Sequence, residues 1–220
     1  MGKRNCAATL EPEMSGVELA ALEKWIASAS LKGKHLEVGT AAGGTLCHLM
    51  KQYSGDTRPP FAVVDTMVYF SDQLKVVQAN LTANGLHPED VDFRIMSSAE
   101  AYSAAVAINE RFDFILIDAS HKISSVMDDL RWLRLLNTGG IACFHDYAPR
   151  FKGVRWPIDR FLHKYPHFER LGLSGTLLGI TRTKEVERME VTHLDRLWAQ
   201  LWSPLLQLDR GLRKRFTGKR

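Results

Sequence analysis

Cysteine is scarce in this chain of 220 residues: there are three, and no two have the spacing of a CxxC pair. An odd number of cysteines argues against a disulfide framework, and the absence of a CxxC pair argues against a thiolate zinc site. The first residues lack the apolar run of a signal peptide. No segment approaches the roughly 20 consecutive apolar residues that a membrane-spanning helix requires. We therefore expect a protein without a membrane span, located in the cytoplasm.

The chain also lacks a strong charge of one sign outside its last eleven residues. The formal net charge is +4. Residues 210–220 carry six basic side chains and no acidic one, so the rest of the chain carries a net charge of −2. Clustered lysine and arginine favour contacts with phosphate groups. Because these charges are confined to the tail, nucleic acid is not the expected partner.

Apolar and charged residues make up 45% and 25% of the chain, which is typical of a globular protein. The length suits one α/β domain. Short apolar segments predict strands at 35–38, 61–65, 91–96, 112–118 and 141–145. Amphipathic segments predict helices at 16–29, 44–53, 71–84, 99–109 and 123–136. Unbroken apolar strands that alternate with helices indicate a parallel sheet covered on both faces.

Several boundaries rest on single residues. Ser71 is the expected cap of the third helix, and the segment Asn137–Gly140 is expected to turn the chain into the fifth strand. Both expectations follow from the known preference of serine for helix caps and of asparagine and glycine for turns.

The pattern changes after the fifth predicted strand. A helix is expected at 157–165, and the segments 168–173 and 176–181 predict an antiparallel hairpin. A last apolar stripe at 195–202 predicts a helix that docks on the domain. We expect Pro204 to interrupt this helix, because proline lacks the backbone N–H that a helix interior requires.

A glycine-rich turn follows the first predicted strand, between Glu37 and Thr45. Gly39 and Gly43 let the backbone turn tightly and approach a ligand, and the next helix begins with unpaired N–H groups. The spacing GxxxGG differs from the GxGxxG of dinucleotide-binding turns. A carboxylate at Glu37 would repel a pyrophosphate but could pair with an ammonium group. The turn therefore favours a cofactor with an amino-acid part over NAD, although a purely structural turn is the alternative.

Two polar residues follow the next strands. Asp65 ends the second strand, where an acid can accept hydrogen bonds from both hydroxyls of a ribose. Ser97 and Ser98 follow the third strand, where an adenine edge would be contacted. A solvated aspartate and a helix-capping serine are the alternative interpretations. Because the carboxyl ends of parallel strands share one edge of the sheet, these groups should line one crevice.

The segments that carry a resemblance to a known family are Glu37-x-Gly39-x-x-x-Gly43, Asp65, Ile117-Asp118-x-x-His121, Gly139-Gly140 and Phe144-His145-Asp146-Tyr147. The series resembles the class I methyltransferases. It is most similar to the branch of small-molecule and sugar O-methyltransferases and cephalosporin-hydroxylase-like proteins. The resemblance covers about residues 33–182. It implies a Rossmann-like, doubly wound α/β fold with a mostly parallel seven-stranded sheet, an antiparallel last strand and helices on both faces.

The resemblance also implies a domain organisation and a cofactor. Residues 1–182 would form the cofactor-binding domain, with a leading helix within 1–30, and residues 183–220 a C-terminal helical segment with a basic tail. The implied cofactor is S-adenosylmethionine (SAM), with Glu37 at its methionine amine and Asp65 at its ribose. The expected cofactor-binding residues are Glu37, Gly39, Thr40, Ala41, Gly43, Thr45, Asp65, Ser98 and Asp118.

Two aspartates end neighbouring strands and should face the crevice, Asp118 after the fourth strand and Asp146 after the fifth. Two such carboxylates can hold a divalent cation that orients a substrate hydroxyl and lowers its pKa. In similar metal-dependent enzymes, an aspartate at the position of Asp118 and two adjacent acids after the fifth strand are the ligands. This chain has His145-Asp146 there, and imidazole suits manganese, iron or zinc better than magnesium. The predicted metal ligands are Asp118, His145 and Asp146, for Mg²⁺ or Mn²⁺; a metal-free role is the alternative.

His121 follows Asp118 by three residues. In the similar sugar methyltransferases a histidine at this spacing is the general base, and an imidazole pKa near about 6.5 suits that role. A helix-anchoring role is the alternative. We expect His121 and Asp118 to be the catalytic residues.

The sequence therefore predicts a SAM-dependent enzyme that methylates a hydroxyl of a small molecule, such as a sugar or a glycosylated metabolite. A nucleic-acid methyltransferase is the first alternative. It lacks support from an NPPY-like tetrapeptide, since the corresponding position reads His145-Asp146-Tyr147-Ala148. A catalytically silent SAM-binding scaffold protein is the second. The resemblance to this family and the apolar stripe at 195–202 also suggest a homodimer.

Overall fold

A computed structural model describes residues 13–186 and 188–217, with side chains described as far as residue 207. Its strands are β1 (His35–Val38), β2 (Phe61–Asp65), β3 (Val91–Ile95), β4 (Phe112–Ile117), β5 (Leu136–Phe144), β6 (Phe168–Ser174) and β7 (Leu177–Arg182). They form one seven-stranded sheet in the order β3-β2-β1-β4-β5-β7-β6. Strands β1 to β5 pair in parallel, whereas β7 is antiparallel to both β5 and β6. The predicted Rossmann-like sheet with an antiparallel last strand is confirmed.

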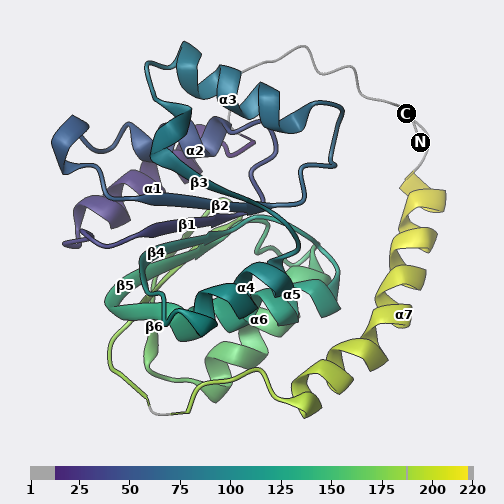
Figure 1. The fold of residues 1–220 in the computed structure, drawn as a ribbon. Helices are drawn as coiled ribbons and strands as arrows, with labels where there is room; N and C mark the ends of the chain where they lie inside the picture. Colours follow the sequence, from purple (N-terminus) through teal and green to yellow (C-terminus); the bar gives the residue numbers. More distant parts are fainter. Residues whose placement is uncertain (1–12, 187, 218–220) are drawn as a thin grey trace.

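Helices cover both faces of this sheet (Figure 1). They are α1 (Gly16–Ala27), α2 (Gly44–Met50), α3 (Gln73–Ala83), α4 (Ser98–Ala107), α5 (Ile123–Asp129), α6 (Lys152–Lys164) and α7 (His193–Thr217). Three short 3-10 helices are η1 (Gly55–Thr57), η2 (Pro88–Asp90) and η3 (Leu130–Leu135). Helices α1, α2 and α3 lie on one face, and α4, α5 and α6 lie on the other.

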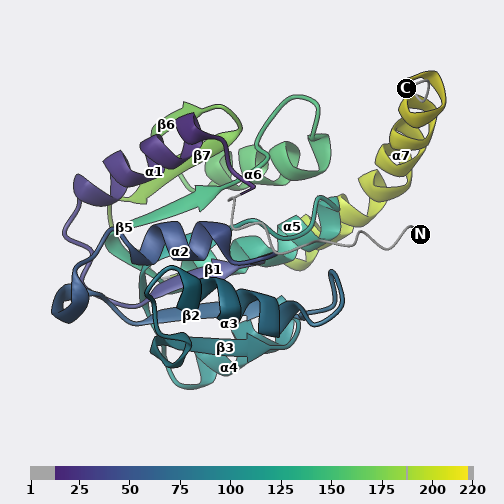
Figure 2. The ribbon, with the colours of Figure 1, turned by 90° about the horizontal axis from the view of Figure 1, so that it is seen from above.

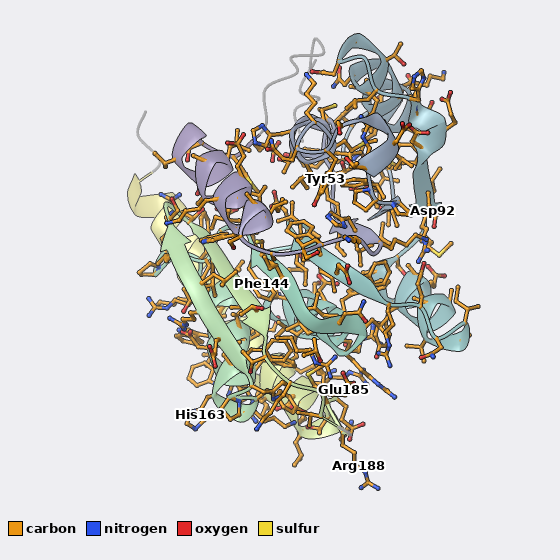
Figure 3. The ribbon with its side chains drawn as sticks, turned by 90° about the vertical axis from the view of Figure 1, so that its left-hand side faces the viewer. Tyr53, Asp92, Phe144, His163, Glu185 and Arg188 are labelled. Carbon is orange, nitrogen blue, oxygen red and sulfur yellow. The ribbon has the colours of Figure 1, made fainter. Side chains whose placement is uncertain are left out.

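The two faces have separate hydrophobic cores because successive side chains of a strand point in opposite directions. In β4, Phe114 and Leu116 pack beneath α1–α3, whereas Ile115 and Ile117 pack beneath α4–α6. The side chain of Phe144 lies buried among the strands (Figure 3). Because both faces are covered, the central strands β1, β2 and β4 are buried along almost their whole length, which agrees with the pattern that predicted a parallel sheet.

Two predicted boundaries are wrong, one at the fifth strand and one in the helix that follows β4. Residues 137–140 do not precede the fifth strand, because β5 begins at Leu136. Leu136 pairs with Phe112, and the next pair is Ile141 with Phe114, so residues 137–140 bulge between two registers. The asparagine and glycines therefore do form a local turn, but inside the strand. The helix expected at 123–136 ends at Asp129 and continues as the tighter η3.

Three helix ends also differ from the prediction. Asp72, with a φ of 57°, and not Ser71, precedes α3. Helix α6 begins at Lys152 and contains Pro157, which the sequence suggested as its start. Helix α7 runs through Pro204 and is not interrupted there. Pro157 is buried, whereas Pro204 is exposed, so α7 keeps its helical course through Pro204 without packing around that residue.

Figures 1 and 2 both show that the C-terminal end of α7 projects away from the α/β body. Its first half packs on α5 and α6, and Trp198 and Leu206 contact the core beneath. The rings of Trp156 and Trp202 meet edge to face with 5.1 Å between centroids. The two tryptophans of the predicted stripe thus dock on the domain, whereas Leu197 and Leu201 of the same stripe are exposed. Within the described ranges, no helix has the length and apolarity to cross a membrane. The basic side chains of 210–220 lie outside the described side chains, and the division of the chain at residue 182 stays a prediction.

Candidate active site

A cavity of about 620 Å³ lies at the carboxyl ends of the parallel strands. Five of the predicted cofactor residues line it: Gly39, Ala41, Asp65, Ser98 and Asp118. His121 and Asp146 also line it. The other predicted cofactor residues are not part of its lining: Glu37, Thr40, Gly43 and Thr45. The structure therefore brings together strand ends that are up to about a hundred residues apart in the sequence, as open parallel sheets do.

Gly39 ends β1 with a φ of 84°. A Cβ atom at this position would lie 2.3 Å from the carbonyl oxygen of Asp118. Only glycine fits this conformation and this approach, so the glycine holds the ends of β1 and β4 together at the cavity floor. Gly43, with a φ of 83°, leads into α2.

Glu37 is buried, with 2% of its surface exposed. Its carboxylate accepts a hydrogen bond of 2.9 Å from the Thr40 hydroxyl. Burial and the nearby charges of Asp118 and Asp65 raise the pKa of Glu37 to about 8, against the opposing effect of the Thr40 bond. Among the side chains of residues 13–186 and 188–207, no cation forms an ion pair with Glu37. A buried carboxylate is costly unless it is paired, and a ligand ammonium would provide that pairing.

Asp65 is held at the cavity wall by two backbone donors. Thr40 N donates to its Oδ2 at 3.0 Å, and Met67 N donates to its Oδ1 at 2.7 Å. A carboxylate has about four acceptor sites, so both oxygens keep lone pairs for further donors. This fixed carboxylate can accept hydrogen bonds from two ribose hydroxyls.

The two serines after β3 have different roles. Ser97 caps α4 in a capping box with Glu100, so the capping alternative holds for Ser97. Ser98 lines the cavity, but its hydroxyl accepts a hydrogen bond of 2.9 Å from Trp132 Nε1. The Ser98 hydroxyl is therefore committed to the protein interior, and its backbone is the part that remains available to a ligand.

His121 and Asp146 form a pair at the cavity. His121 Nε2 lies 2.7 Å from Asp146 Oδ2, and the imidazole is 39% exposed. Asp146 follows β5 with a φ of 57°, an unusual conformation for a residue other than glycine. Burial alone would raise the pKa of Asp146, but the bond with His121 and the nearby His145 lower it. The His121 ring also packs on Phe151, with 5.1 Å between centroids. This arrangement gives a histidine that a carboxylate orients, as general bases require.

His145 lies between three carboxylates. Its Nδ1 is 3.1 Å from Asp118 Oδ1 and 3.9 Å from Asp146 Oδ2, and its Nε2 is 3.8 Å from Glu18 Oε2. Burial alone would lower the pKa of His145, but the bond to Asp118 and the charges of Asp146 and Glu18 raise it to about 9.

Asp118, His145 and Asp146 each offer a ligand atom, and the three atoms lie within 4.8 Å of one another. This mixed nitrogen and oxygen set fits a divalent transition metal. Binding would release the proton from His145, because metal ligands must be deprotonated.

Sequence reasoning did not identify several residues of this site. Neither Glu18 nor Phe151 was expected at the site. Glu13, Tyr69 and Lys122 also line the cavity. No short motif marks these residues, because loops and a helix distant in sequence bring them to the site.

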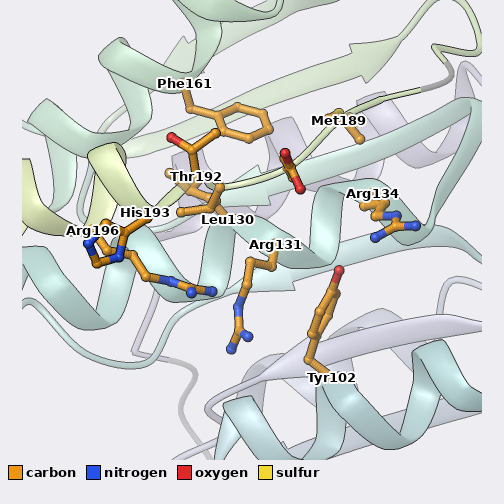
Figure 4. A pocket seen from close by; sticks show the side chains of 11 residues that line it. Tyr102, Leu130, Arg131, Arg134, Phe161, Met189, Thr192, His193 and Arg196 are labelled. Atoms are coloured by element: carbon orange, nitrogen blue, oxygen red, sulfur yellow. The ribbon is translucent and has the colours of Figure 1, made fainter.

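A second cavity, of about 360 Å³, lies elsewhere, between α4, η3, α6 and the start of α7 (Figure 4). Three arginines line it, Arg131, Arg134 and Arg196. Arg131 and Arg196 both lie against Asp128, at 3.9 Å and 3.0 Å. None of the predicted catalytic, cofactor-binding or metal-binding residues lines this second cavity, so we place the candidate active site in the larger one.

The sequence and the fold were compared with known proteins. A profile of the family described as "Methyltransferase domain" matches residues 36–147. No curated protein matches the chain.

Several solved structures share the fold. One is an O-methyltransferase from Bacillus cereus in complex with SAH, with 18% identity, a TM-score of 0.58, and coverage of 77% of this chain and 82% of that one. Another is the O-methyltransferase TomG from Streptomyces achromogenes, involved in tomaymycin synthesis, in complex with SAM. Its identity is 15% and its TM-score 0.60, over 80% of this chain and 82% of that one. A third is CalS11, a TDP-rhamnose 3'-O-methyltransferase of calicheamicin biosynthesis. It has 14% identity and a TM-score of 0.57, over 74% of this chain and 76% of that one.

Proposed function

This chain belongs to the methyltransferase-domain family, and on that premise we propose that it transfers a methyl group from SAM to a hydroxyl of a small molecule. The observation that carries the proposal is the pair of His121 Nε2 and Asp146 Oδ2, 2.7 Å apart, in the cavity that Asp65 and Gly39 also line. One cavity thus holds a general base and the residues suited to the cofactor. The O-methyltransferases that share the fold support the same reaction.

The protein's residues suit SAM at two points. The buried Glu37 suits the methionine ammonium, and the fixed carboxylate of Asp65 suits the ribose hydroxyls. When bound, SAM supplies a methyl group on a positively charged sulfur. Gly39 has no Cβ, so the ends of β1 and β4 can lie close together at the cavity wall.

His121 would accept the proton of the acceptor hydroxyl, while SAM would supply the methyl group to the hydroxyl oxygen, lose its methyl–sulfur bond and leave as the neutral thioether SAH. Asp146 orients the imidazole and stabilises the positive charge that it gains. Phe151 packs on the ring and limits its rotation. Proton removal by such a positioned base typically contributes about 10²–10⁴-fold to the rate.

A divalent cation is the second part of the proposal. Asp118, His145 and Asp146 would hold it, and it would lower the pKa of the acceptor hydroxyl. The histidine in this set favours Mn²⁺ over Mg²⁺. Asp146 would then serve both the cation and His121, so the two parts are coupled.

The acceptor class is the least constrained part. The TDP-rhamnose methyltransferase among the structural relatives supports a sugar or glycosylated acceptor. The basic residues of 210–220 favour nucleic acid as the alternative acceptor. A silent SAM-binding scaffold is the remaining alternative, and the oriented His121 argues against it. The cytoplasmic location and the homodimer stay predictions.

Calorimetric titration of SAM and SAH into the protein, with and without Mn²⁺, tests the cofactor. Micromolar binding supports the proposal, and failure of both ligands to bind folded protein would overturn it. Transfer of labelled methyl groups to a panel of glycosylated metabolites tests the reaction. Methylation of oligonucleotides in place of small molecules would establish the alternative.

A further inference from the structure

Glu18 belongs to α1, ahead of the segment that matches the family profile. It is buried, with 5% of its surface exposed, although glutamate is rarely buried without partners. As the third residue of α1 it forms a capping box with Ser15. A capping glutamate is normally exposed to solvent, and burial gives this one a second role.

The carboxylate of Glu18 is fixed by four hydrogen bonds. Its Oε2 accepts from Ser15 N at 2.8 Å and from Ser15 Oγ at 2.7 Å. Its Oε1 accepts from Thr176 N at 2.7 Å and from Thr176 Oγ1 at 2.9 Å. Burial alone would raise the pKa of Glu18, but these bonds lower it to about 2. The four hydrogen bonds therefore hold the carboxylate in one place.

The turn between β6 and β7 is shaped around Glu18. Gly175, with a φ of 57°, has no Cβ, and a Cβ there would lie 2.7 Å from Glu18 Oε1. Helix α1 thus meets this turn through Glu18, and Tyr147 N in the active-site loop donates to Thr176 O at 2.8 Å. The hydrogen bonds that hold Glu18 therefore connect it, through Thr176, to the loop that carries His145 and Asp146.

The Oε2 atom of Glu18, which accepts both hydrogen bonds from Ser15, also faces His145. Glu18 Oε2 lies 3.8 Å from His145 Nε2, and both side chains are at most 10% exposed. The opposite ring nitrogen, Nδ1, faces Asp118 and Asp146. A carboxylate on one side of an imidazole determines which nitrogen carries the proton and which way the other nitrogen points.

We propose that Glu18 is a positioning residue that fixes the His145 ring with Nδ1 directed at Asp118 and Asp146. For the metal, this inference rests on the proposed function. A histidine that binds a metal through one nitrogen usually donates from the other to a carboxylate, and loss of that carboxylate weakens metal binding about 10–100-fold. Helix α1, which lies outside the segment that matches the family profile, thereby contributes a residue to the active site.

The test compares the full-length chain with Glu18→Gln, which keeps the size and one acceptor oxygen but removes the charge. Mn²⁺ affinity is measured by calorimetry, SAM affinity in the same way, and folding by thermal unfolding. We expect about 10–100-fold weaker Mn²⁺ binding with unchanged SAM binding. The matched control is Glu23→Gln on the same helix, whose half-exposed carboxylate contacts His48 and not the site.

Two further measurements keep the test decisive. The variant Thr176→Val keeps Glu18 and removes one of its four anchors, so it should weaken Mn²⁺ binding less than Glu18→Gln does. In metal-free protein, ¹⁵N spectra of the histidine rings should show a shifted Nε2 signal for His145 in Glu18→Gln and no shift in Glu23→Gln.

The outcomes separate the two proposals. If the wild-type chain binds no Mn²⁺, the metal part of the proposed function fails, and the ring spectra alone decide the role of Glu18. If the wild type and Glu18→Gln bind Mn²⁺ equally, or if the His145 signals coincide, the positioning role of Glu18 is overturned while the proposed function stands.

Discussion

The imidazole of His121 and the carboxylate of Asp146 come from the loops after β4 and β5, and their Nε2 and Oδ2 atoms lie 2.7 Å apart. They are 25 residues apart in the sequence, and only the parallel pairing of β4 with β5 brings them together. The left-handed backbone at Asp146 aims its carboxylate at the histidine. Backbone strain of this kind is typical of functional sites.

Replacing His121 with asparagine should reduce methyl transfer by about 10²–10⁴-fold, because the acceptor hydroxyl loses its base. SAM affinity should stay unchanged, since His121 serves the acceptor. Turnover and calorimetric binding measure the two effects. His163→Asn, at an exposed position late in α6, is the control and should leave both unchanged. Full turnover in His121→Asn would contradict the mechanism.

Replacing Asp65 with alanine should weaken SAM binding by about 1.5–3 kcal/mol, the value typical of hydrogen bonds to a charged group. The variant also loses the acceptor for Thr40 N and Met67 N, so its thermal unfolding must be measured alongside. Asp56→Ala, in the exposed η1, is the control. If folded Asp65→Ala bound SAM as tightly as the wild type, the ribose would lie elsewhere.

SAM binding should release a proton from Glu37. The pKa of Glu37 is about 8 in the ligand-free protein, so near pH 7 most molecules carry the proton. A ligand ammonium favours the ionised form, and therefore affinity should rise as the pH rises toward 8. Calorimetry in buffers of different ionisation enthalpy counts the released protons. Glu37→Gln should bind more weakly and release none; equal proton release in this variant would refute the assignment.

Replacing Gly39 with alanine should destabilise the fold by about 2–5 kcal/mol, because the left-handed backbone and the contact with Asp118 O both oppose a Cβ. Gly55→Ala is the matched control, since nothing lies within 4 Å of its added Cβ and its φ is not positive. Denaturant unfolding measures both variants. Equal stability of the two would show that the β1–β4 floor adapts to a side chain.

The sequence predicted most strands closely. The segments 35–38 and 61–65 match β1 and β2 residue for residue. Both strands are buried on both faces, and such a strand has clear boundaries in the sequence. Predictions failed at residues whose local preference is strong. Pro204 lies inside α7, and the turn residues 137–140 lie inside β5.

The sequence by itself determined the chemistry of the strand ends: Glu37 and Asp65 lie at the ends of buried strands and Gly39, Asp118 and Asp146 follow them, and parallel pairing places such residues at one edge. Only the tertiary structure decided which of these side chains meet. It paired His121 with Asp146, turned Ser98 toward Trp132, and brought Glu18 to His145 from a helix 127 residues away. The reason is physical. The position of a group along a strand follows from a local period of two residues, whereas contacts between loops depend on how helices pack across the whole sheet.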